Sequence, residues 1–84
     1  MHFHSTDGKH FLGVRTNRRG EMEVVYDREG RRRVILKLET GPDSPERIAP
    51  TLARVVNTGD VLGQLAAGLR AEGYTFDLSD EGTE

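Results

Sequence analysis

Several absences in this 84-residue chain limit what it can be. It contains no cysteine, which excludes disulfide bonds and thiolate ligands for a metal. No apolar run approaches the roughly 18 residues of a membrane-spanning helix, and the start of the chain lacks the apolar stretch of a signal peptide. From these absences we expect a cytoplasmic protein.

Aromatic residues and catalytic motifs are scarce as well. The chain has three phenylalanines, two tyrosines and no tryptophan, whereas proteins that bind single-stranded nucleic acid stack the bases on aromatic rings. The three serines have no evident catalytic base beside them, and no glycine-rich segment matches a phosphate-binding loop. We therefore predict that the protein is not an enzyme, and that it has no catalytic residues, no cofactor and no small-molecule substrate.

The histidines form the group that comes nearest to a metal site. His2 and His4 would share one side of a strand, with Asp7 and His10 a short distance along the chain. Imidazole suits zinc or nickel, but a structural site requires four ligands that are held by further hydrogen bonds. We predict no metal site.

Charge is divided unevenly along the chain. Residues 1–40 carry nine basic and six acidic side chains, a net charge of +3. Residues 41–84 carry three basic and eight acidic side chains, a net charge of −5, so the total of −2 conceals a dipolar molecule. A charge distribution of this kind orients a charged partner before contact.

The first half predicts three β-strands. The segments His10–Arg15, Glu21–Tyr26 and Arg33–Leu38 each alternate in the manner of a half-buried strand. The two connections are short and polar and end in Gly20 and Gly30, as expected for a type I turn that closes into a left-handed glycine. These features predict an antiparallel meander.

The second half predicts two helices and a fourth strand. The segment 44–46 (Ser-Pro-Glu) is typical of a helix start, and Pro50 either kinks this helix or marks its true beginning. Asp60 is placed to cap a second helix that ends at Gly73. Alternation returns in Tyr74–Leu78, which we predict to be the fourth strand.

These elements predict one α+β domain at residues 1–78, followed by an acidic tail at 79–84. The expected order is β-β-β-α-α-β: a mainly antiparallel four-stranded sheet with both helices packed on one face. Gly63 and Gly68 lie inside the second helix, where each costs about 1 kcal/mol relative to alanine. We expect them to permit close approach to the sheet or to the first helix. The sequence leaves open where the fourth strand joins the sheet.

The helices are expected to cover one side of the sheet and to build the core with it. The predicted core residues of the three-stranded meander are Leu12, Val14, Met22, Val24, Tyr26, Val34, Leu36 and Leu38. On the uncovered side, alternation places Phe11, Arg15, Glu21, Glu23, Val25, Arg33, Ile35 and Lys37. An apolar centre of Phe11, Val25 and Ile35 within a charged rim is typical of a protein interface. Strand propensity alone is the alternative explanation, since single exposed apolar side chains are common.

We therefore predict an interaction module that binds a partner protein, or a second copy of itself, through the uncovered side. The predicted contact residues are Phe11, Arg15, Val25, Arg33, Ile35 and Lys37. The apolar members would supply contact area, and the basic members would supply orientation and a faster association rate. On this prediction, Ile35→Asp abolishes association and leaves the fold intact.

Nucleic-acid binding is the alternative function. Its predicted residues are Arg15, Arg18, Arg19, Arg28, Arg31, Arg32 and Arg33. Arginine forms paired hydrogen bonds to phosphate oxygens, and antiparallel strands can enter the major groove of DNA. Carboxylates lie within a few residues of these arginines, so a solvated surface of mixed charge also explains them.

Two basic segments, Gly13-Val14-Arg15 and Gly30-Arg31-Arg32-Arg33, resemble the basic strands of the three-stranded DNA-binding domains found at the N-terminus of integrases. The resemblance covers about thirty residues and implies a β-β-β-α order and DNA binding. The second helix and the fourth strand depart from that pattern. Binding of this kind would weaken steeply with salt, because each neutralised phosphate releases counterions.

Overall fold

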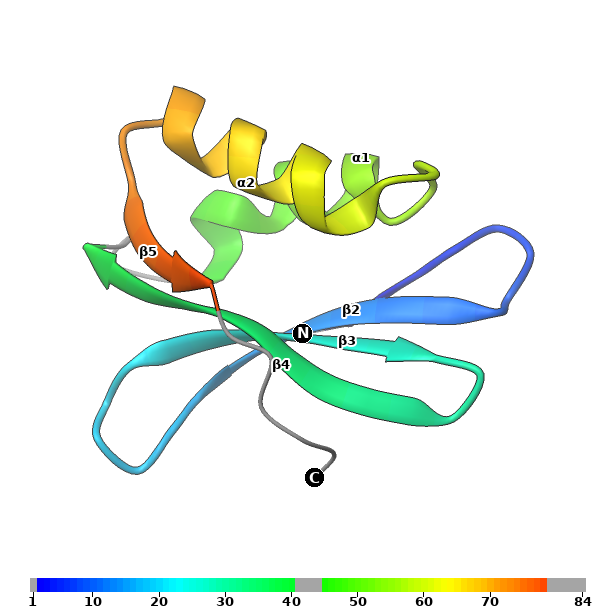
Figure 1. Ribbon diagram of the computed structural model, residues 1–84, viewed down its shortest axis with the longest axis horizontal. Helices are drawn as coiled ribbons and strands as arrows, with labels where there is room; N and C mark the ends of the chain where they lie inside the picture. The colour runs from blue at the N-terminus through cyan, green and yellow to red at the C-terminus, as the bar shows by residue number, and fades with distance from the viewer. Residues whose placement is uncertain (1, 41–44, 79–84) are drawn as a thin grey trace.

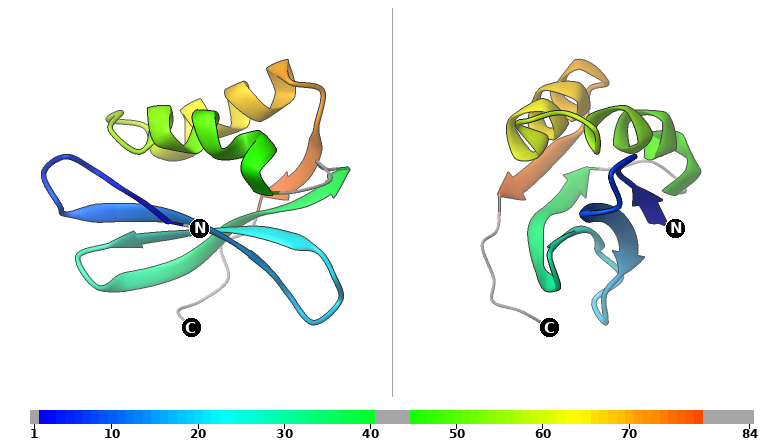
Figure 2. Two further views of the ribbon diagram at one scale, coloured as in Figure 1. Left: turned by 180° about the vertical axis from the view of Figure 1, so that it is seen from behind. Right: turned by 90° about the vertical axis from the view of Figure 1, so that its right-hand side faces the viewer.

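The computed structural model of the chain describes residues 2–40 and 45–78, so the predicted acidic tail lies outside the described residues. The elements are β1 (His2–His4), β2 (His10–Thr16), β3 (Met22–Arg28), β4 (Arg31–Thr40), a 3₁₀ helix (Pro45–Ile48), α1 (Ala49–Val55), α2 (Val61–Ala71) and β5 (Thr75–Leu78). They form two layers, a twisted sheet and both α-helices side by side above it (Figure 1; Figure 2). The predicted α+β class is confirmed.

The five strands lie in the order β1-β2-β3-β4-β5, and each neighbouring pair is antiparallel. The connections of β2 to β3 and of β3 to β4 are the two predicted turns. Gly20 and Gly30 close them with φ of 84° and 85°, the left-handed conformation that glycine adopts without a steric penalty. β5 pairs with β4 at one edge of the sheet, which decides the place of the fourth predicted strand.

β1 is additional to the four predicted strands and pairs with β2 at the opposite edge. The turn that joins the two is organised by the carboxylate of Asp7, which accepts hydrogen bonds from the hydroxyl of Ser5 and from the backbone N–H of Lys9. These two hydrogen bonds, of which the one from Ser5 has the larger effect, lower the pKa of Asp7 below its usual value.

The helical region follows one of the two alternatives that Pro50 left open. Pro45–Ile48 forms a separate 3₁₀ turn, and α1 begins after it with Pro50 in its first turn, where a missing N–H is tolerated. Ser44, the predicted start signal, lies outside the described residues. α2 is capped as predicted, because the carboxylate of Asp60 accepts a hydrogen bond from the N–H of Gly63. No helix in the described ranges is both long and apolar enough to cross a membrane.

The core lies between the sheet and the helix layer. Its buried members are Leu12, Val14, Val24, Ile35, Leu36, Leu38, Ile48, Leu52, Val55, Val56, Val61, Leu65 and Leu69. Half-buried apolar side chains pack around this cluster, among them Phe3 from β1 and Phe76 from β5. Every strand and both helices therefore contribute side chains to the core. Burial of these apolar side chains holds the two layers together.

β4 departs from strict alternation at Ile35. Val24 of β3 lies opposite Leu36, but the next residue, Val25, lies opposite Val34. Ile35 is therefore the extra residue of a β-bulge. Between the bulge and the start of β4, each residue therefore lies on the side of the sheet opposite to the one that strict alternation assigns to it.

The bulge corrects three predictions. Ile35 is 2% exposed and belongs to the core, so its place on the uncovered side is wrong, as is the expectation that Ile35→Asp leaves the fold intact. Arg33 pairs with Tyr26 and borders a hollow beneath the α1–α2 connection, so it too lies on the helix side. Val34, predicted in the core, lies opposite Val25 on the side away from the helices.

A side chain is excluded at each of the two glycines of α2 for a different structural reason. A Cβ atom on Gly68 would lie 2.9 Å from Cγ2 of Thr51 and 3.0 Å from Nη2 of Arg54, so this glycine permits the close approach of α2 to α1. A Cβ atom on Gly63 would instead overlap the carboxylate of Asp60 that caps α2. The predicted close approach to the first helix is therefore confirmed for Gly68, whereas Gly63 makes room for the cap.

Candidate interaction surface

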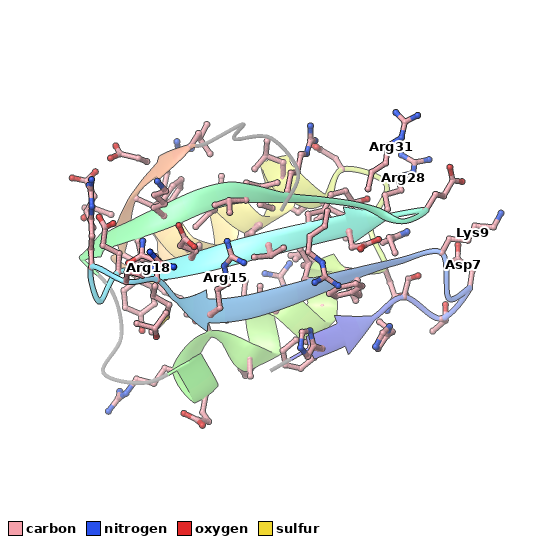
Figure 3. All side chains as sticks on the ribbon, turned by 90° about the horizontal axis from the view of Figure 1, so that it is seen from below. Asp7, Lys9, Arg15, Arg18, Arg28 and Arg31 are labelled. Carbon is pink, nitrogen blue, oxygen red and sulfur yellow. The ribbon has the colours of Figure 1, made fainter. Side chains whose placement is uncertain are left out.

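One side of the sheet is covered by the helix layer, and no helix or strand of the described chain covers the other side (Figure 2; Figure 3). The register of the strands arranges its side chains in rows that run across the sheet. We name this surface the open face and divide it into a charged row (Arg15, Glu23, Lys37, Asp77), an apolar row (His2, Gly13, Val25, Val34) and an aromatic row (His4, Phe11, Asp27, Arg32).

The charged row alternates in sign across four strands. Nε of Arg15 lies 3.0 Å from Oε1 of Glu23, and the side chains are 40% and 5% exposed, so the carboxylate is buried beneath the guanidinium group. Lys37 of β4 lies opposite Glu23, and Asp77 of β5 lies opposite Lys37. The row therefore reads positive, negative, positive, negative from β2 to β5.

The aromatic row is centred on the ring of Phe11, which is half-buried. The rings of His2, from the neighbouring row, and of His4 have centroids 5.4 Å from that of Phe11. The guanidinium carbon of Arg32 lies 5.2 Å from the same centroid, within the range of a cation–π contact. Arg32 also lies 3.5 Å from Oδ2 of Asp27, so the stacked arginine is held by a neighbouring carboxylate.

The apolar row is a floor beneath the polar side chains. Val25 and Val34 are 5% and 1% exposed, and Ile35 lies in the core, so the predicted apolar centre of the surface is wrong except for Phe11. A small hollow of about 60 Å³ lies beside Gly13 and Val25. The open face is therefore a surface of paired charges and aromatic rings above buried valines.

The turn between β2 and β3 holds one end of the charged row. The side-chain oxygen of Asn17 accepts hydrogen bonds from the backbone N–H groups of Arg19 and Glu21. Its amide group donates to the carboxylates of Glu21 and Glu23. Glu23 thus keeps partners on two sides although it is buried, as a buried carboxylate requires.

The arginines predicted to bind nucleic acid form two groups at opposite ends of the sheet. One group lines a hollow of about 720 Å³ together with Lys37, and consists of Arg15, Arg18 and Arg19. The other group lines a hollow of about 690 Å³, and consists of Arg28, Arg31, Arg32 and Arg33. Arg18 and Arg19 lie in the turn between β2 and β3, whereas Arg28 and Arg31 flank the turn between β3 and β4 at the opposite end of the sheet (Figure 3). The other three are divided between the charged row (Arg15), the aromatic row (Arg32) and the helix side (Arg33). No single strip of the sheet collects them.

The three histidines are separated as well. His2 and His4 lie on the open face, whereas Nε2 of His10 lies 2.7 Å from the carbonyl oxygen of Val56 on the helix side. Over residues 2–40 and 45–78, no three His, Cys, Asp or Glu side chains are grouped as metal ligands would be.

A further hollow, of about 240 Å³, lies on the helix side between the sheet and the start of α2. Tyr26, Arg28 and Arg33 line it from the strands, and Thr58 and Asp60 from the helix layer. The carboxylate of Asp60 lies at the N-terminal, positive end of the α2 dipole. Its negative charge disfavours the binding of an anion to Arg28 and Arg33. We assign no ligand to this hollow.

Two carboxylates lie side by side at the β5 end of the open face. Glu39 of β4 shares a hydrogen bond with Asp77, and that hydrogen bond, together with the negative charge of Asp77, raises the pKa of Glu39 above its usual value. A raised carboxyl pKa means that the stability contributed by this pair is present at low pH. It is lost as the pH rises through the pKa of Glu39.

We predict that Asp77→Asn lowers the pKa of Glu39 toward its usual value, because the substitution removes the neighbouring charge. The measurement is an NMR titration of the side-chain carboxyl carbon of Glu39. Asp77→Glu keeps the charge and is the matched control, in which the pKa should remain raised. The same pKa in Asp77→Asn and in the wild type would contradict the pairing.

Comparison of the chain with protein-family models, with curated proteins and with solved structures finds no match. The functional argument therefore depends on the geometry of the open face. Alternation along the strands correctly places Phe11, Arg15, Glu23, Val25 and Lys37 on this face, and Glu21 immediately precedes β3 beside it. It misses Asp27 because the predicted strand ended at Tyr26, whereas β3 continues to Arg28. It misses Arg32 and Val34 because of the bulge in β4, and Asp77 because an edge pairing decides its position.

Proposed function

We propose that this chain is a non-enzymatic interaction module whose open face binds a protein surface. The observation that supports this proposal best is the arrangement around Phe11, where an aromatic ring is stacked by Arg32 at 5.2 Å above a buried apolar floor. Aromatic and arginine side chains are enriched at the energetic centres of protein interfaces. Phe11 and Arg32 are the anchor residues in this proposal.

The charge balance of the open face favours a protein over a nucleic acid as the partner. Its basic side chains are Arg15, Arg32 and Lys37, and its acidic ones are Glu23, Asp27, Glu39 and Asp77. A polyphosphate backbone is attracted by net positive charge, which this face lacks. A protein surface with its own mixed charges can instead match the alternating pattern.

Photo-crosslinking tests the proposal. A photoreactive amino acid at position 37 stands on the open face, and the same amino acid at position 64, an exposed site on α2, is the matched control. In an extract of the source organism we expect position 37 to crosslink to protein, either another chain or a second copy. Position 64 should give little product, and Phe11→Ala should reduce the product at position 37.

Fluorescence anisotropy with single- and double-stranded oligonucleotides tests the alternative. We expect no binding through the open face at about 50 mM salt, where contacts with phosphates are strongest. Oligonucleotide binding that weakens sharply at about 200 mM salt and is lost in Arg15→Glu would contradict the proposal and favour nucleic-acid binding. Equal crosslinking from positions 37 and 64 would contradict it as well, because the open face would then have no preference.

A further inference from the structure

The charged row of the open face is antisymmetric in charge about one line. This line runs along the strands between β3 and β4, the central pair of the charged row. Glu23 and Lys37 lie one strand either side of it, and Arg15 and Asp77 lie one strand further out. Each residue of the row therefore has a residue of opposite charge at the mirrored position.

The central pairs of the other two rows match across the same line. Asp27 of β3 lies opposite Arg32 of β4, so this pair also has opposite charges at mirrored positions. Val25 lies opposite Val34, so the centre of the apolar floor is the same on both sides of the line. The outer members of these two rows, on β1 and β2, have no counterpart on β5, which pairs only with Leu36–Thr40 of β4.

A two-fold axis along this line places a second copy face to face with the first, with each row reversed over itself. Arg15 then faces Asp77 of the second copy, and Arg32 faces Asp27. Lys37 of the second copy faces the position where Glu23 is buried beneath Arg15, and the two valine floors lie opposite each other beneath the polar side chains. A two-fold axis across the strands instead places each charge over an identical charge. Only the first arrangement is complementary, and two-fold interfaces of this self-complementary kind are the commonest in soluble oligomers.

We infer, on the basis of the proposed function, that the occupant of the open face is a second copy of this chain in a two-fold, face-to-face dimer. Aligned sheets cross at about 30° because each is twisted, so the rows near the axis stay in register most closely. Arg15 is the outermost contact of the charged row, and the length of its side chain compensates for the divergence there.

The acidic pair at the β5 end supports the same arrangement. Glu39 and Asp77 place two carboxylates side by side, and their hydrogen bond, followed by the negative charge of Asp77, raises the pKa of Glu39. In the dimer, Arg15 of the second copy stands opposite Asp77 and compensates this excess of negative charge. The side chain of Arg15 is 40% exposed, so it is accessible to a partner while it pairs with Glu23.

The size of the face indicates a reversible dimer. The extents of the molecule are 31 × 26 × 19 Å, and the sheet spans the longest and the shortest of them. The outline is therefore about 600 Å² per copy, near the lower limit for specific interfaces. Charged residues at the centre of the face cost desolvation, which weakens the complex further. We therefore expect dissociation in the micromolar to millimolar range.

The test is sedimentation velocity of the full chain from roughly 5 µM to 1 mM, the range in which an interface of this size dissociates. We expect the sedimentation coefficient to rise with concentration toward that of a dimer. Asp77→Arg changes an exposed residue of an edge strand, so its fold should be unaffected. It should weaken the dimer about tenfold or more, because two like-charge contacts replace two attractive ones.

A mixing experiment separates this dimer from effects within one chain. Arg15→Glu alone should also weaken self-association, with Arg54→Glu and Gln64→Arg on the helix layer as controls that leave it unchanged. When Arg15→Glu and Asp77→Arg are mixed, a dimer of one copy of each has two attractive pairs between positions 15 and 77. One pair has the wild-type charges, and the other has the two charges exchanged. We expect a heterodimer with a Kd within about threefold of the wild-type value. Arg15 and Asp77 lie on β2 and β5, so no contact within one chain explains this rescue.

Several outcomes overturn the inference. A wild-type chain that remains monomeric at about 1 mM overturns it, and so does a dimer that both variants leave intact. The latter result would favour edge-to-edge pairing of β5, where Leu78 is 57% exposed. Lack of rescue on mixing, with both variants shown to be folded by circular dichroism, overturns it as well. A different protein crosslinked at position 37 by a monomeric chain leaves the proposed function standing, whereas oligonucleotide binding overturns both.

Discussion

Replacing Ile35 with aspartate should abolish the cooperative unfolding transition of the domain. The side chain of Ile35 is 2% exposed and belongs to the core between the sheet and the helices. Truncation of a buried isoleucine to alanine alone costs about 2–5 kcal/mol. An unpaired carboxylate adds several kcal/mol of desolvation, and the total stability of a small domain is about 5–15 kcal/mol.

The measurement is thermal unfolding followed by circular dichroism. Arg33→Asp, two residues away in the same strand and exposed, is the matched control and should lower Tm by no more than a few degrees. A folded Ile35→Asp variant with a Tm close to that of the wild type would contradict the bulge. Ile35 would then lie on the open face, as strict alternation predicts.

Leu65→Ala should cause the second large loss of stability. Leu65 is fully buried in the middle of α2, where its side chain belongs to the core beneath the helix layer. The substitution removes apolar burial and leaves a cavity, which together cost about 2–5 kcal/mol. For a domain of this size, that corresponds to a decrease in Tm of roughly 10–30 °C.

Leu62→Ala in the same helix is the matched control. The residue type is identical, but Leu62 is half-buried and packs against the edge of the core. We expect its cost, measured by urea unfolding, to be clearly smaller than that of Leu65→Ala, because less apolar surface is lost and no closed cavity remains. Equal costs for the two variants would mean that α2 is rotated about its axis relative to the arrangement described above.

Some elements could be predicted from the sequence and others could not, for a physical reason. The turn glycines and the Asp60 cap depend on residues within a few positions of one another, and both were predicted. β1 was not predicted, because a strand of three residues acquires its structure from pairing with β2. Of the candidate surface, Phe11, Arg15, Glu23 and Lys37 could be predicted from alternation.

Local signals along the chain were enough to predict the α+β class, the antiparallel meander, the cap of α2 and the division of charge between the two halves of the chain. The pairing of the strands instead places Ile35 in the core, Val34 and Arg32 on the open face, and Asp77 at the end of the charged row. These positions depend on which residues pair between strands. Because side chains alternate with a period of two, one inserted residue moves every side chain beyond it in the strand to the other face of the sheet. In β4 these are the residues between the start of the strand and Ile35.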